Sequence, residues 1–285
     1  MDRSLSHDDH HASQGVFMEA TTTGMNRTGA SASPAGAQAM EDAVERYSPP
    51  GPIDLSQSRE IRLLYAQEAG PLGTVPPPTS LGSMVRTGVS KLMGEHPEIL
   101  MDKIGERIAF ERGGTRLYDA LMVKYQAAVN AGAKVPTPAD AVKAAGGTDD
   151  VALQADASAL ATLQRIRAEE LQHFQMLCDA MRQLGGDPTA QTPCADVIAT
   201  ASMGLIQVVS DPRTTLAQAL SAILTAELTD NAGWELLIQL AEQAGETDLI
   251  SEFAQALTEE QRHLVTVQAW LQALVVSGPL PSDAV

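Results

Sequence analysis

The chain has 285 residues, with 36 acidic and 19 basic side chains and a formal net charge of −17. This balance argues against a nucleic-acid-binding protein, because such proteins present basic surfaces to the phosphates. Two cysteines, Cys178 and Cys194, are too few for a disulfide framework. The first residues lack the apolar stretch of a secretory signal, and no run reaches the roughly 20 apolar residues of a membrane span. We expect a cytoplasmic protein with no membrane and no nucleic-acid partner.

The N-terminal part, residues 1–80, is rich in small and polar residues and poor in large apolar ones. Such a composition cannot bury enough apolar surface to offset the entropy of ordering the chain. We therefore predict a largely disordered tail, with one short helix over 59–69. Four prolines within residues 71–78 then interrupt regular structure.

Helical patterns fill residues 84–280. After a short helix over 84–93, four long helices are expected over about 97–131, 151–184, 215–244 and 248–276. The second long helix ends at Gly185-Gly186-Asp187-Pro188, a combined stop signal. A loop insertion over 133–150 separates the first two long helices. A shorter helix over 195–209 lies in the connection between the second and the third.

Strand signals are nearly absent from the chain. Aromatic residues make up 4% of it, and no segment alternates apolar and polar residues convincingly. We therefore predict an all-α fold, a four-helix bundle over residues 84–280. One long crossover, which carries the short extra helix, joins its two halves.

One pentapeptide pattern, Glu-Glu-x-x-His, occurs in two of the long helices. It runs from Glu169 to His173 in the second and from Glu259 to His263 in the fourth. The later Glu and the His, three residues apart, share a helix face, and a carboxylate with an imidazole suits iron or manganese. Three of the six histidines lie beyond residue 11, and two of those three belong to this pattern. The repetition predicts a metal site.

The first and third long helices each carry a glutamate seven residues before an aromatic ring. Glu111 precedes Tyr118, and Glu227 precedes Trp234. Seven residues are about two helical turns, so carboxylate and ring lie on nearly the same face. Glu106, five residues before Glu111, lies about 140° around the helix and is not expected on that face. The chain therefore reads as a repeat of two helical hairpins.

These residues resemble the ferritin-like di-iron carboxylate superfamily, which includes bacterioferritins and rubrerythrins. That family takes one Glu from each of two helices and Glu-x-x-His from each of the other two. The resemblance covers about residues 97–276 and implies a ferritin-like four-helix bundle. It implies bridging carboxylates at Glu170 and Glu260. The full ligand set that it implies is Glu111, Glu170, His173, Glu227, Glu260 and His263. Tyr118 matches a tyrosine near the metals of bacterioferritins, and Trp234 occupies the symmetric position; both are expected beside the site.

The resemblance implies two iron ions as cofactor, with two manganese ions as the alternative. It implies O₂ or peroxide as reaction partners and an electron donor that the sequence does not identify; a homodimer stays open. We expect an oxidoreductase. The alternatives are a ferroxidase without a large storage cage and a metal-free helical scaffold. The 133–150 loop and the tail depart from cage-forming ferritins, and the lack of a Cys-x-x-Cys pair departs from ordinary rubrerythrins.

Two details leave alternatives open. Glu169 and Glu259 either orient an imidazole or face the solvent. Gly113 and Gly114 in mid-helix cost about 1 kcal/mol each relative to Ala. Either close helix packing or a local bulge offsets that cost, and Gly233 in the third helix favours packing.

Overall fold

The computed structural model describes residues 23–52, 54–78, 97–133, 135–147, 156 and 158–276. Every regular element among these residues is helical, which confirms the all-α prediction. The chain divides into two compact units, one of Glu19–Leu72 and one that contains Gly73–Val285. The predicted helix over 84–93 and the predicted domain boundary at 80–84 lie outside the described residues.

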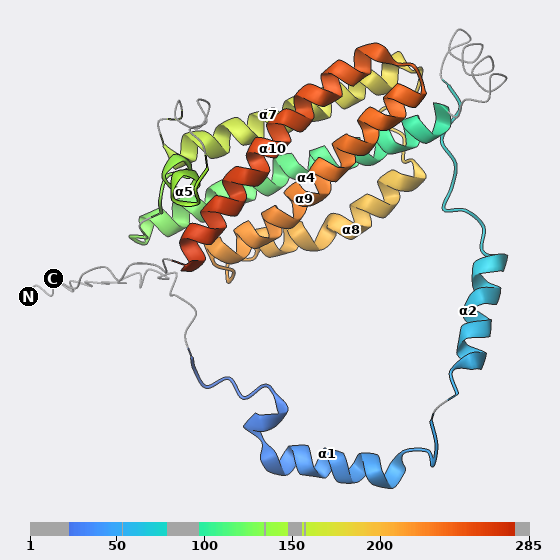
Figure 1. Cartoon of the computed structure of the whole chain (residues 1–285), viewed down its shortest axis with the longest axis vertical. Helices are drawn as coiled ribbons and strands as arrows, with labels where there is room; N and C mark the ends of the chain where they lie inside the picture. Colours follow the sequence, from blue (N-terminus) through green and yellow to red (C-terminus); the bar gives the residue numbers. More distant parts are fainter. Residues whose placement is uncertain are drawn as a thin grey trace, which may run out of the picture. The chain divides into compact units, whose positions relative to one another are not determined.

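The first unit consists of short helices that bury no side chain. They are the 3₁₀ helix η1 (Ala30–Ala32), α1 (Pro34–Tyr47) and α2 (Ser56–Glu68) (Figure 1). α2 lies where a helix over 59–69 is predicted. α1 has no counterpart among the predicted elements. It forms because Pro34 pre-sets its first turn and strong helix formers such as alanine follow, a local preference that overall composition does not reveal.

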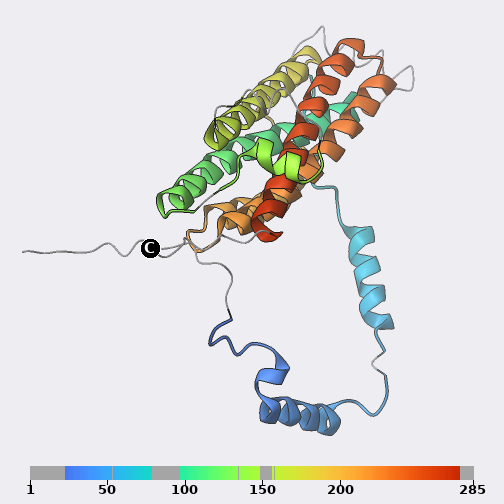
Figure 2. The same cartoon turned by 60° about the vertical axis from the view of Figure 1, so that its left-hand side comes forward.

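The second unit is built on four long helices. They are α4 (Pro97–Asn130), α7 (Ala159–Gln183), α9 (Leu216–Gln243) and α10 (Thr247–Val276). α4 packs against α7 and α9, and α10 packs against α9 and α7, so the four make the bundle that both views show (Figures 1 and 2). The predicted residues 151–155 of the second helix lie outside the described part of the chain.

Local signals set the ends of these helices. The Ser158 side chain accepts a hydrogen bond from the Ala161 amide and starts α7, and a capping box of Thr215 and Gln218 starts α9. Gly185 follows α7 with a φ of 85°, and Gly245 follows α9 with a φ of 68°. These left-handed conformations favour glycine and end the helices.

Two shorter helices cover the bundle. α5 (Pro138–Ala144) lies within the predicted loop insertion and packs on α10, where Trp270 Nε1 donates a 2.7 Å hydrogen bond to the Pro136 carbonyl. α8 (Pro193–Ser210) packs on α4 and α9 in the crossover. By length and composition alone α8 is apolar enough to cross a membrane, the single such helix among the described residues and a weak indication by itself.

The core has a polar layer between two apolar clusters. Along α10, Phe253 belongs to one cluster and Trp270 to the other. Glu260 and His263 lie between them and are fully buried. On α4, α7 and α9 as well, buried ionisable residues lie between the two apolar clusters. The fold therefore places a buried layer of ionisable groups at mid-height of the bundle.

Candidate metal centre

All six predicted ligand residues lie in the polar layer. Each is between 0 and 2% exposed, and together they come from all four long helices. Their ligand-type atoms fall into groups whose members lie within 4.8 Å of one another. One group is Glu170, Glu227, Glu260 and His263, and another is Glu111, His173 and Glu260. A third group is Glu111, Glu170, Asp230 and Glu260. Glu260 belongs to all three, so the layer offers two adjacent candidate metal positions.

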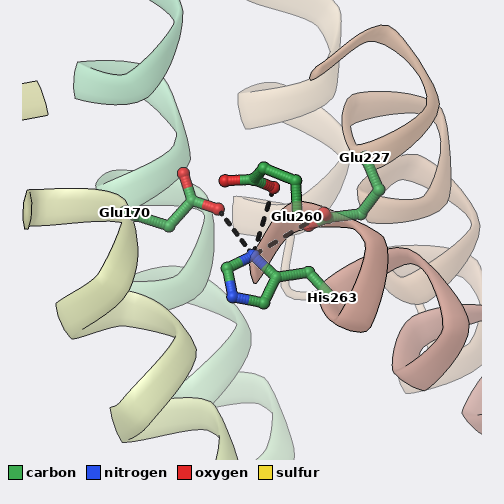
Figure 3. Close-up of side chains that lie close together, drawn as sticks. All are labelled: Glu170, Glu227, Glu260 and His263. Carbon is green, nitrogen blue, oxygen red and sulfur yellow. Dashed lines mark hydrogen bonds and ion pairs between the residues drawn. The ribbon is translucent and has the colours of Figure 1, made fainter. Parts of the chain in front are cut away.

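The first position gathers around His263. Its Nδ1 atom lies 3.1 Å from Glu260 Oε2, 3.6 Å from Glu170 Oε1 and 3.9 Å from Glu227 Oε2 (Figure 3). Three carboxylates and one imidazole nitrogen therefore converge on one point. Such a mixed oxygen and nitrogen set suits iron or manganese.

The second position gathers around His173. Its Nδ1 atom lies 2.7 Å from Glu260 Oε1 and 3.8 Å from Glu111 Oε2. Glu260 thus turns one oxygen towards each histidine, as a carboxylate bridging two ions would.

Two further glutamates contact the outer sides of the imidazoles. Glu169 Oε2 lies 2.7 Å from His263 Nε2, and Glu259 Oε2 lies 2.9 Å from His173 Nε2. Each motif therefore supplies a carboxylate to the histidine of the other motif. A carboxylate that accepts from Nε2–H leaves Nδ1 free to bind a metal, which supports the orienting alternative for these residues.

Arginines hold these outer carboxylates in turn. Arg165 donates from Nη1 to Glu169 at 2.9 Å, and Arg262 lies about midway between them, 3.9 Å from Glu169 and 4.0 Å from Glu259. Glu106, by contrast, pairs with Lys103 and belongs to none of the candidate metal groups found among the described residues.

Two of the three mid-helix glycines make room for a buried side chain. A Cβ on Gly114 would lie 2.0 Å from Glu170 Oε2, and one on Gly233 would lie 2.7 Å from Arg107 Nη1. Both glycines therefore leave space for a side chain of the polar layer. A Cβ on Gly113 would meet no atom within 4 Å, and nothing in the structure explains that glycine. α4 is an unbroken α-helix, so packing, not a bulge, accounts for Gly114.

The two predicted aromatic residues lie beside different histidines. The Tyr118 hydroxyl donates to Glu227 Oε1, and the ring is 6.4 Å from that of His263. The Trp234 ring is 5.5 Å from that of His173. Each metal position thus has one aromatic ring at its side.

Two buried residues of this layer have no counterpart among the predicted site residues. Arg107 is 1% exposed, donates from Nη2 to Glu111 Oε1 at 2.9 Å and forms an ion pair with Asp230. Arg107 lies four residues before Glu111, and Asp230 lies three residues after Glu227, so each shares a helix face with a ligand-type glutamate. This helical spacing is the feature of the sequence that could have identified both residues as neighbours of the site.

The buried carboxyls do not all ionise together. Burial, and then the nearby Glu170, raises the pKa of Glu111 well above its usual range. Burial and Glu260 do the same to the pKa of Glu227. Although burial opposes it, the Glu259 and Glu260 carboxylates beside the ring raise the pKa of His173 to about 10. The metal-free layer therefore holds protons that a cation would displace.

Comparison with known proteins agrees with this architecture. The family model of the ferritin-like domain matches residues 159–275, which include α7, α9 and α10. Neither the curated proteins nor the solved structures gave a match. The match and the all-helical bundle support a ferritin-like domain in this part of the chain.

Proposed function

We propose that the chain is a non-haem di-iron carboxylate protein that uses a buried two-metal site to reduce O₂ or peroxide. The six residues Glu111, Glu170, His173, Glu227, Glu260 and His263 would hold the ions. One observation carries this proposal, the set of buried atoms in the layer that have the chemistry of metal ligands and no hydrogen-bond partner.

Four such atoms occur among these six residues. They are Glu111 Oε2, Glu227 Oε2, Glu260 Oε1 and His173 Nδ1. The close approach of the last two lacks hydrogen-bond geometry. Leaving buried polar atoms unpaired costs about 1–3 kcal/mol each, so a cation between them would relieve a cost that the fold otherwise carries.

Charge balance supports two divalent ions. Four ligand carboxylates carry four negative charges when ionised, and the Arg107–Asp230 ion pair adds none. Burying isolated charges is costly unless they are paired or bind metal. Two divalent cations match the four carboxylates.

Two bound Fe²⁺ ions would supply two electrons, enough to reduce peroxide to water or O₂ to peroxide. The protein's own side chains orient the metal ligands. Glu169 and Glu259 contact Nε2 of the two imidazoles, and the Tyr118 hydroxyl donates a hydrogen bond to Glu227 Oε1. The apolar clusters on both sides exclude bulk water from the layer. An electron donor must restore the ferrous ions.

The test is an anaerobic Fe²⁺ titration of the metal-free protein, followed by addition of O₂ or peroxide. Rapid oxidant consumption that His173→Ala abolishes is the expected result, and unchanged consumption in that variant contradicts the proposal. The number of Fe²⁺ ions oxidised per chain separates an oxidase or peroxidase from a ferroxidase. Repeated turnover with an added organic reductant indicates an oxidase or peroxidase, whereas oxidation of many Fe²⁺ ions per chain indicates a ferroxidase for which iron is the substrate. Stoichiometric manganese in protein purified from cells would redirect the assignment to a dimanganese site.

A further inference from the structure

The two halves of the helical repeat differ around the centre. A shift of 116 residues brings Glu111 onto Glu227. Under this shift the surrounding residues do not match: Arg107 corresponds to Ile223, Gly114 to Asp230, and Tyr118 to Trp234. The two metal positions therefore have different neighbours.

Arg107 is a cation fixed beside one position. Its guanidinium bonds Glu111, pairs with Asp230 and lies 4.4 Å from the centre of the Phe110 ring. Gly233 leaves the space that the guanidinium fills. Arg107 therefore occupies one oxygen of the Glu111 carboxylate, and its positive charge balances the negative charge of Asp230.

Among the described residues, no arginine or lysine pairs with Glu227 in the other position. Glu227 accepts a hydrogen bond from the neutral Tyr118 hydroxyl, and the residue at the place of Arg107 is the apolar Ile223. His263 Nδ1 also has three carboxylates within 3.9 Å, whereas His173 Nδ1 has two within 3.8 Å. Local charge therefore favours the position of Glu227 and His263.

We infer that the two metal positions are unequal, with Arg107 as the positioning residue that makes them so. The position of Glu227 and His263 binds its ion first and more tightly, and the position of Glu111 and His173 binds second and exchanges more readily. This inference rests on the proposed two-metal site. Its physical cause is that the Arg107 guanidinium engages Glu111 Oε1, so this carboxylate attracts a cation less strongly than Glu227 does.

The test is a calorimetric titration of the metal-free full chain with Co²⁺, which oxygen does not readily oxidise. Two steps that differ on the order of tenfold in affinity are expected. Glu227→Gln should remove the tight step, and Glu111→Gln should remove the weak one. The double variant Arg107→Met/Asp230→Asn keeps the net charge and frees the Glu111 carboxylate from Arg107, so the affinity of the weak step should approach that of the tight step. Arg107→Lys retains the charge and should keep two separate steps.

Two equal steps in the unaltered chain, or loss of the tight step in Glu111→Gln, would overturn the inference while leaving the two-metal site intact. No Co²⁺ binding at all would instead overturn the proposed function. If the double variant does not fold by circular dichroism, the unaltered chain and the two single glutamine variants still decide between these outcomes.

Discussion

At the scale of single residues, the centre is defined by an exchange between its two motifs. Glu169 contacts His263, and Glu259 contacts His173. Each outer carboxylate thus fixes the ring that the opposite motif contributes. This exchange ties α7 to α10 across the bundle.

Loss of an outer carboxylate should weaken metal binding without disrupting the fold. Glu169→Gln and Glu259→Gln each remove a charged acceptor from an imidazole Nε2–H, so we expect a loss of about 10- to 100-fold in metal affinity. Competition with a chelator measures it. Glu252→Gln, at an exposed position two turns earlier on α10, is the matched control. Affinities within about twofold of the unaltered chain in both variants would contradict the orienting role.

Metal binding should release protons at neutral pH. The pKa of about 10 means that His173 holds its extra proton in the metal-free protein at pH 7, and burial shifts the pKa of Glu111 upward as well. A metal binds the deprotonated forms, so affinity should rise with pH until His173 loses its proton. Calorimetry in two buffers of different ionisation enthalpy counts the protons. Binding heats that do not depend on the buffer would contradict this reading.

At the scale of helices, glycines in α4 and α9 admit the polar layer. Gly114 leaves the space in which the Glu170 carboxylate lies, and Gly233 leaves that of Arg107. The helix cost of these residues is thus linked to the centre and not to helix–helix contact alone.

Adjacent glycines of α4 give a matched pair of substitutions. Gly114→Ala places a Cβ against the Glu170 carboxylate, which can swing aside, so metal affinity should fall at least about tenfold while the fold persists. Gly113→Ala meets no atom and should raise the free energy of unfolding by up to about 1 kcal/mol with metal affinity unchanged. Metal titration and chemical denaturation measure both. Equal metal affinities in the two variants would show that Gly114 does not serve the site.

Most helix ends of the bundle could be predicted closely from the sequence because strong signals flank them, but the second long helix begins at Ala159, after the Ser158 cap, and not at 151. Gly185 and Gly245 end α7 and α9, and Thr215 starts α9. The pairing of Arg107 with Asp230 could not be predicted, because charged residues on a helix are usually solvated and only packing brings these two together. The composition of the N-terminal part does not predict α1, because this helix depends on local helix propensity and buries no side chain.

At the scale of the whole molecule, the bundle carries a destabilising layer that a metal would make favourable. In the metal-free protein the pKa of His173 is raised from 6.5 to about 10. Its stabilising contribution is complete below pH 6.5 and is lost as pH rises towards 10. The raised pKa values of Glu111 and Glu227 act in the same direction.

The melting temperature of the metal-free protein should therefore fall between about pH 6.5 and pH 10, whereas that of the metal-loaded protein should not. Calorimetric scans at several pH values compare the two forms. A melting temperature of the metal-free protein that rises over this range would contradict the assigned protonation states.

The central claim is that the polar layer holds two metal ions. The most direct measurement is elemental analysis of the full chain after anaerobic loading with Fe²⁺ and gel filtration, with Glu260→Ala treated in parallel, because Glu260 belongs to both positions. We predict about two iron ions retained per chain and loss of both in the variant. No retained iron, or the same iron content in Glu260→Ala, would contradict the account.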